Sequence, residues 1–96
     1  MKRNYPLKIS QVIEKLFRDN DMEETVLMHR ALAAWPVVVG PVVNRQTVER
    51  RVAAGVICVR IASAVVRQEL SMQRSALISA LNHAVGADVI KEIKFV

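Results

Sequence analysis

Aromatic residues are scarce in this chain: they make up 4% of its 96 residues, whereas hydrophobic residues make up 52%. The core must therefore be built from Val, Ile, Leu, Ala and Met, which fill volume but offer few rings for stacking. Proteins that bind single strands by base stacking use exposed rings, so the composition argues against that mode. A chain of this length fits one domain, and we expect residues 1–96 to form a single domain with one small core.

Cysteine and histidine are equally sparse. Cys58 is the single cysteine, which excludes an intramolecular disulfide, and only His29 and His83 accompany it. These residues form no zinc-ligand spacing, so we expect no metal and no cofactor. Catalytic carboxylate pairs, activated nucleophiles and phosphate-binding glycine loops cannot be assembled either, and we expect a protein that is not an enzyme.

The sequence also lacks the apolar run of a signal peptide. The start, Met1 to Pro6, is charged, and Glu14 and Lys15 interrupt the next apolar segment. We find no apolar stretch long enough to cross a bilayer, which takes about 20 such residues. The expected compartment is the cytoplasm, with no membrane partner.

Positive charge, in contrast, is in excess. Fourteen Lys and Arg residues against nine Asp and Glu give a net charge of +5. Six arginines fall in the later part of the chain: Arg45, Arg50, Arg51, Arg60, Arg67 and Arg74. Arginine favours bidentate contacts to phosphate or carboxylate. We therefore take these six as candidate nucleic-acid-binding residues, on the hypothesis that they gather on one outward surface.

A second interpretation of the same arginines stays open. A basic surface can be solvated and held by local pairs, such as Glu49 with Arg51 on one strand face, without binding any nucleic acid. Arg67 and Arg74 are seven residues apart, which places them on a shared helix face away from the core. Net charge is an argument about partners and not about fold.

Hydrophobic periodicity predicts an α+β fold that begins with two helices. Apolar residues recur at helical spacing after Ser10 as far as Asn20, and again from Asp21 to Trp35. The stretch from Pro36 to Thr47 is predicted to be a compact connection, with a short helix beginning at Pro41 as one option. Trp35 is expected to anchor the core, and Gly40 to serve backbone geometry.

The second half of the chain predicts a hairpin, a long helix and a third strand. Two β-branched runs, 48–53 and 56–62, flank a turn at Ala54 and Gly55, with Ile57, Val59 and Ile61 facing the core and Arg60 outward. One long helix follows, capped by Ser63 and ended by Gly86, and residues 89–96 alternate as a strand with Ile93 and Phe95 inward. The expected architecture is a three-stranded sheet with helices on one face.

Several short segments occur together in a recognisable order. They are Trp35 to Gly40, Val43 with Gln46-Thr47, Gly55 to Ile61, Ser63-Ala64, Gln68 to Leu70, and the tail from Leu81-Asn82 through Gly86 to Ile93-Lys94-Phe95. From about Ile9 to the C-terminus this set resembles the DciA family of bacterial replicative-helicase loaders. The resemblance implies a KH-like fold and a role in assisting the replicative helicase onto single-stranded DNA, which makes helicase and DNA the implied partners and a nucleoid-associated location the implied one.

The sequence departs from KH domains at the phosphate-clamping loop. Gly40, Gly55 and Gly86 are the three glycines of the chain, so no G-x-x-G motif exists. Contact with nucleic acid would then use the arginines. Two alternatives stay open: a protein-interaction module without nucleic-acid affinity, and a KH-like RNA-binding protein. The free edge of a three-stranded sheet could also pair with a second copy and give a homodimer.

Overall fold

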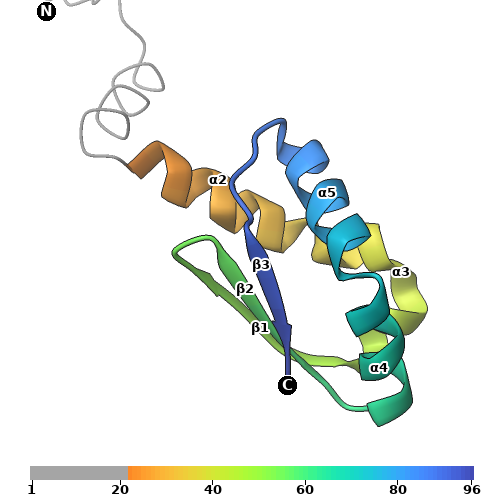
Figure 1. The fold of residues 1–96 in the computed structure, drawn as a ribbon. Helices are drawn as coiled ribbons and strands as arrows, with labels where there is room; N and C mark the ends of the chain where they lie inside the picture. Colours follow the sequence, from red (N-terminus) through yellow and green to blue (C-terminus); the bar gives the residue numbers. More distant parts are fainter. Residues whose placement is uncertain (1–21) are drawn as a thin grey trace, which may run out of the picture.

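The computed structural model describes residues 22–96, in which four helices and three strands follow one another (Figure 1). Their bounds are α2 Met22–Ala33, α3 Trp35–Gln46, β1 Thr47–Ala53, β2 Val56–Ile61, α4 Ala64–Met72, α5 Arg74–Val85 and β3 Glu92–Phe95. The strands lie in the order β1-β2-β3, with β1 antiparallel and β3 parallel to β2. The α+β class is confirmed. The helix predicted between Ser10 and Asn20 lies outside the described residues.

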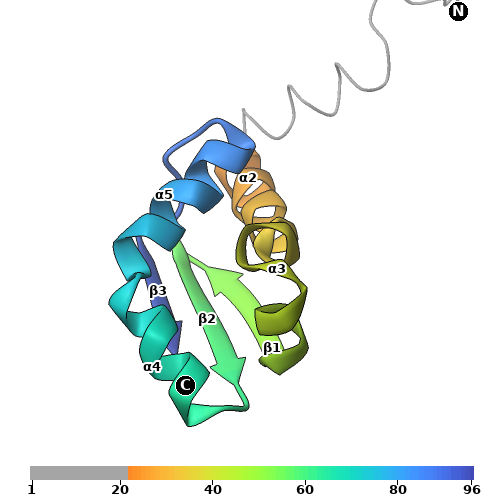
Figure 2. The same ribbon diagram turned by 90° about the vertical axis from the view of Figure 1, so that its right-hand side faces the viewer.

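All four described helices lie on one face of the sheet (Figure 2). Alternation along the strands decides which face is covered: Ile57, Val59 and Ile61 of β2 and Ile93 of β3 are at most 1% exposed, as predicted. The helices and the segment before β3 supply the rest of the core, namely Met28, Ala31, Trp35, Leu70, Leu77, Leu81, Val89 and Ile90. Burial of these apolar side chains is the main term that stabilises the fold.

The hairpin between β1 and β2 turns through Ala54 and Gly55, as predicted. Both residues have positive φ, 52° and 80°, which is the geometry of a two-residue turn whose twist matches that of the strands. Gly55 is also buried and held on both sides: its N–H donates to Met28 Sδ at 2.9 Å, and its carbonyl accepts from Lys91 N at 2.8 Å. A Cβ atom at Gly55 would lie 3.2 Å from Val89 O. The turn therefore ties the hairpin to α2 and to the segment before β3.

The predicted connection from Pro36 to Thr47 is helical in the structure. Residues Trp35–Gln46 form α3, which is kinked at Gly40, where φ is 86° and ψ is 169°. Only glycine adopts this conformation readily, and Pro41 then begins the second half of the helix with its φ already fixed. The option of a helix from Pro41 thus describes the second half, while the Val-rich first half was not predicted to be helical.

The predicted long helix is two helices. Gln73, with φ −110° and ψ 19°, separates α4 from α5. A straight helix from residue 64 to residue 85 would be about 33 Å long, whereas a six-residue strand such as β2 is about 20 Å long. The break lets both halves stay on the sheet. The predicted ends are confirmed: Ser63 Oγ accepts from Val66 N at 3.3 Å, and Gly86 ends α5 with φ 73°.

One segment corrects the expectation that no apolar stretch could span a bilayer. By length and composition alone, Glu23–Gln46 qualifies, with a mean hydropathy of 1.5 over its most apolar part. In the structure this segment is two helices of 12 residues each, interrupted at Ala34 and kinked at Gly40. Neither reaches the roughly 20 residues of a spanning helix, and Trp35 at their junction is fully buried in the core.

Candidate nucleic-acid interface on the open sheet face

The side of the sheet that faces away from the described helices forms the candidate site, which we call the open face (Figure 1). Side chains of paired residues point to the same side of a sheet, so the register defines its members. They are Glu49, Arg51 and Ala53 of β1, Val56, Cys58 and Arg60 of β2, and Glu92, Lys94 and Val96 at and after β3. Three cations and two carboxylates leave this face with one net positive charge.

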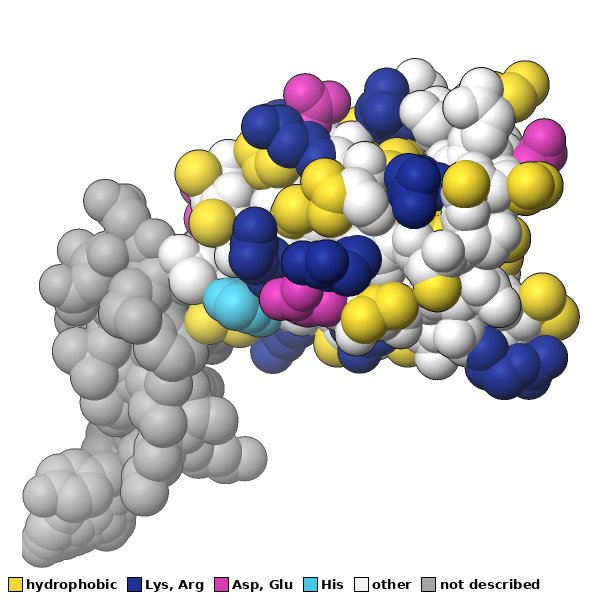
Figure 3. All heavy atoms as spheres, turned by 90° about the horizontal axis from the view of Figure 1, so that it is seen from below, with side chains coloured by type: hydrophobic (Ala, Val, Ile, Leu, Met, Phe, Trp, Pro, Cys, Tyr) yellow, Lys and Arg dark blue, Asp and Glu magenta, His cyan; other side chains and the backbone are white. Residues whose placement is uncertain are grey.

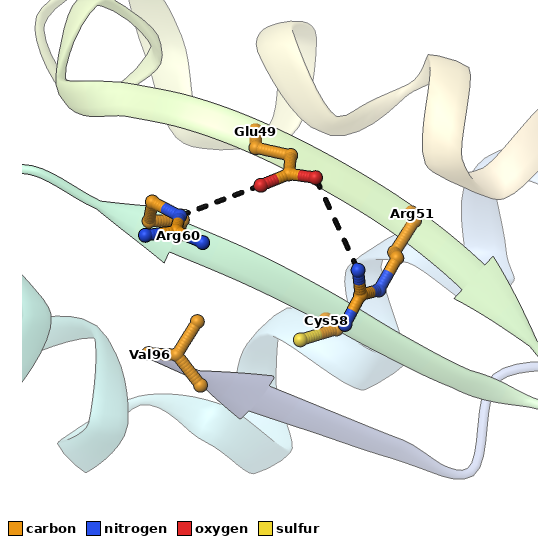
Figure 4. A pocket seen from close by; sticks show the side chains of 5 residues that line it. All are labelled: Glu49, Arg51, Cys58, Arg60 and Val96. Atoms are coloured by element: carbon orange, nitrogen blue, oxygen red, sulfur yellow. Dashed lines mark ion pairs between the residues drawn. The ribbon is translucent and has the colours of Figure 1, made fainter.

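The centre of the open face is a shallow pocket in which Glu49 lies between two arginines (Figure 4). Glu49 Oε1 is 3.4 Å from Arg60 Nε, and its Oε2 is 4.0 Å from Arg51 Nη1. Cys58 and Val96 complete the lining. All three charged side chains are more than half exposed, so each ion pair contributes little free energy and is screened by salt. A polyanion can therefore compete with Glu49 for both guanidinium groups.

Arg45 and Arg50 are exposed but do not belong to the open face. Arg50 pairs with Val59, whose side chain is buried under the helices, so Arg50 projects to the helix side at the edge of the sheet. Arg45 lies in the last turn of α3. In the space-filling view, the Lys and Arg side chains do not form one continuous patch, and hydrophobic and acidic side chains lie among them (Figure 3).

Arg67 and Arg74 are partly buried and bind backbone carbonyls of the sheet. Arg67 Nη2 donates to Ile61 O at 3.1 Å, and Arg74 Nε donates to Ile93 O at 3.0 Å. The guanidinium of Arg74 also lies 5.7 Å from the ring centre of Phe95. Both side chains therefore reach the sheet, Arg67 from α4 to β2 and Arg74 from α5 to β3. The hypothesis that all six arginines share one outward surface is wrong, and so is the placement of this pair away from the core.

Trp35 lies inside the core and offers no ring to a ligand. Its side chain is fully buried, and its Nε1 donates to Thr47 Oγ1 at 3.1 Å. Thr47 Oγ1 in turn donates to Val43 O at 3.1 Å, so the polar atom of the indole is satisfied. The ring centre lies 6.4 Å from that of Phe95, at an angle of 45°. Trp35 thus joins α3 to the sheet.

Lys94 belongs to the open face but was not among the six candidate residues, which were all arginines. The alternation of the last strand placed it outward, and its register opposite Cys58 sets it two strands away from Arg51. Together, Arg51, Arg60 and Lys94 span all three strands. Among residues 22–96, no three His, Cys, Asp or Glu side chains converge. The chemistry these side chains offer is electrostatic contact with an anion.

The comparison with protein families gives one match. The model described as Dna[CI] antecedent, DciA, matches residues 8–95 of the 96-residue chain. The match includes every helix and strand described above. No curated protein matches the chain.

Proposed function

Because the chain belongs to the DciA family, whose name places it among replication proteins related to helicase loading, we propose that it assists the loading of the replicative helicase onto single-stranded DNA. It does so by binding and not by catalysis. The family match over residues 8–95 is the observation that carries this proposal. The protein acts in the cytoplasm, at the nucleoid where the helicase is loaded, and not at a membrane.

The proposed contact with DNA is the open face. Arg51 and Arg60 have side chains that are 73% and 61% exposed, and Lys94 is exposed beside them on β3. Cations at such positions neutralise phosphates and release counterions, which drives binding without reading the sequence. The open face carries no aromatic side chain, so base stacking adds nothing. We therefore expect binding that is strongly salt-dependent and nearly indifferent to base sequence.

The mechanism that follows is positioning. Contacts to phosphate hold a single strand across β1, β2 and β3, while another surface of the domain binds the helicase. Holding both partners on one small body raises the effective concentration of the strand near the helicase ring. No nucleotide hydrolysis is involved, because the sequence has no phosphate-binding glycine loop.

A second candidate function is protein binding without affinity for nucleic acid. Glu49 supports it, because this carboxylate lies close to both open-face arginines and reduces the charge that a phosphate would meet. Salt titration separates the two: DNA binding that weakens steeply with salt supports the first, and no binding at low salt supports the second. Binding to RNA in place of DNA would give the same salt dependence. The titration is therefore done with single-stranded DNA and with single-stranded RNA.

The experiment that tests the loading role is capture of the cognate replicative helicase by the immobilised chain, with and without single-stranded DNA. We expect the helicase to be retained in both conditions, and more of it when DNA is present. Loss of capture in both conditions would contradict the role implied by the family. Capture of helicase with no effect of DNA would favour the second candidate.

A further inference from the structure

Strand β1 lies at an edge of the sheet, and the backbone register shows which of its groups are free. Val96 N donates to Val59 O at 2.9 Å, and Ile61 N donates to Val96 O at 3.1 Å. Val59 and Ile61 thus direct their backbone groups toward the β3 side. Because successive residues of a strand direct these groups to opposite sides, Cys58 and Arg60 direct theirs toward β1.

The residues of β1 that pair with Cys58 and Arg60 are Arg51 and Glu49, whose backbone groups are therefore used inside the sheet. Arg50 and Val52 alternate with them and direct both N–H and C=O away from β2. These groups have no hydrogen-bond partner among residues 22–96. An edge with free groups at alternate residues is a template for a further strand.

We propose that this edge binds an extended acidic segment of a protein partner as a fourth strand. The proposal goes beyond the DNA contact, because it uses the free backbone groups of β1 and shares only Arg51 with the open face. Arg50 projects to the helix side of the edge and Arg51 to the open side, and both are exposed. A bound strand places its side chains next to these two arginines on either face, where acidic residues give favourable cross-strand pairs.

Charge also decides against a second copy of the chain as the occupant. In the two-fold antiparallel pairing that joins Arg50 of each copy to Val52 of the other, the axis passes at Arg51 and places the two Arg51 side chains directly opposite each other. A pairing centred on Arg50 does the same with Arg50, and one centred on Val52 sets Arg50 opposite the turn residue Ala54, outside the strand. Like charges in directly opposite positions destabilise a strand pair. An acidic strand of another protein avoids this repulsion.

A bulge at the N-terminal end of β1 limits the length of the bound strand. The register shifts between Thr47 and Glu49, which leaves Val48 as an extra residue with 64% of its surface exposed. Such a bulge ends regular pairing. The bound segment therefore pairs only along the part of β1 between Glu49 and the turn at Ala54.

Amide hydrogen exchange on the full chain tests the proposal residue by residue. The probe is a short synthetic peptide with blocked ends in which two adjacent Glu residues are flanked by Val, so that one Glu lies on each face of the bound strand. We expect the exchange of the Arg50 and Val52 amides to slow by about tenfold when the peptide is at ten times its Kd. The amide of Arg51 already donates inside the sheet, so its exchange should stay unchanged.

Two controls isolate the backbone and the charge. The same peptide with N-methyl groups along one edge loses its donors, and the peptide with Lys in place of Glu loses its complementary charge; neither should protect the two amides. Arg50→Pro removes the outward N–H at an edge position that tolerates proline, whereas Arg50→Gln removes only the charge, so Arg50→Pro should weaken binding more. The modified peptides test the unaltered chain and do not depend on these variants folding.

The outcomes that overturn the proposal are distinct from those that overturn the DNA contact. Unchanged exchange of Arg50 and Val52 at millimolar peptide, or equal protection by the N-methylated or Lys peptide, would overturn it. Oligo(dT) should leave these two amides unchanged and shift the signals of the open-face cations. Protection of Arg50 and Val52 by oligo(dT) alone would make the edge a nucleic-acid site and overturn the proposal.

Discussion

The side chain of Asn82 binds both the backbone N–H and the backbone C=O of Ile90. Asn82 Oδ1 accepts from Ile90 N at 2.7 Å, and Asn82 Nδ2 donates to Ile90 O at 2.9 Å. The same oxygen accepts from Val89 N at 3.1 Å. Ile90 is fully buried, and the segment that contains it leads directly into β3. One residue of α5 therefore fixes the entry of the last strand into the sheet.

Substitution of Asn82 by Ala should destabilise the fold by about 2 kcal/mol, because it leaves buried backbone groups of the segment before β3 without partners. Equilibrium urea denaturation measures this loss. The control is Asp88→Ala: Asp88 also accepts from Asn82 Nδ2, but its side chain is 83% exposed, so we expect a change below about 0.5 kcal/mol. Equal effects of the two substitutions would contradict the role of Asn82.

The turn at Ala54 should tolerate a better residue. Ala54 has φ 52°, a left-handed conformation that Asn and Gly adopt at lower cost than Ala. Ala54→Asn is expected to stabilise the protein by about 0.5 kcal/mol or more, measured as a rise in the denaturation midpoint. Gly55→Ala provides the contrast. Its Cβ atom would lie 3.2 Å from Val89 O, so we expect this substitution to destabilise the fold. A stability loss on Ala54→Asn would contradict the assigned turn geometry.

Arg74 should behave as a structural residue. Arg74→Gln removes the hydrogen bond to Ile93 O and the contact with the Phe95 ring, and we expect a loss of about 1–2 kcal/mol in the free energy of unfolding. Arg51→Gln, which breaks only an exposed ion pair at 4.0 Å, should change stability by less than about 0.5 kcal/mol. Similar stability of the two variants would show that the Arg74 contacts contribute nothing to the fold.

Local sequence signals predicted the parts of the fold that depend on near neighbours. The alternation around Val59 identified both faces of β2, Ser63 and Gly86 marked helix ends, and the Ala54-Gly55 turn placed the hairpin. The break at Gln73 has no Gly or Pro near it that would have predicted it from the sequence. Its physical reason is the limited length of the sheet, which local sequence does not show. Of the three valines before Gly40, which are also helical, Val38 and Val39 pack against the core, and local propensity does not contain this packing.

The candidate site was predicted only in part for the same reason. The outward position of Arg60 follows from strand alternation, and that of Lys94 from the same rule on β3. The inward turn of Arg74 depends on a carbonyl of β3 that is 19 residues away along the chain. Spacing along a helix shows which residues share a face, but not which face meets the sheet.

The most direct test of the proposed DNA contact is a salt titration of oligo(dT) binding by fluorescence anisotropy with two triple variants. One carries Arg51→Gln, Arg60→Gln and Lys94→Gln on the open face, and the matched control carries Arg30→Gln, Arg45→Gln and Arg50→Gln, exposed cations outside it. Each loses the same charge. We expect the open-face variant to bind far more weakly and its slope of log K against log salt to be smaller by about 2, while the control stays near the unaltered chain. Equal loss in both variants would contradict a site on the open face.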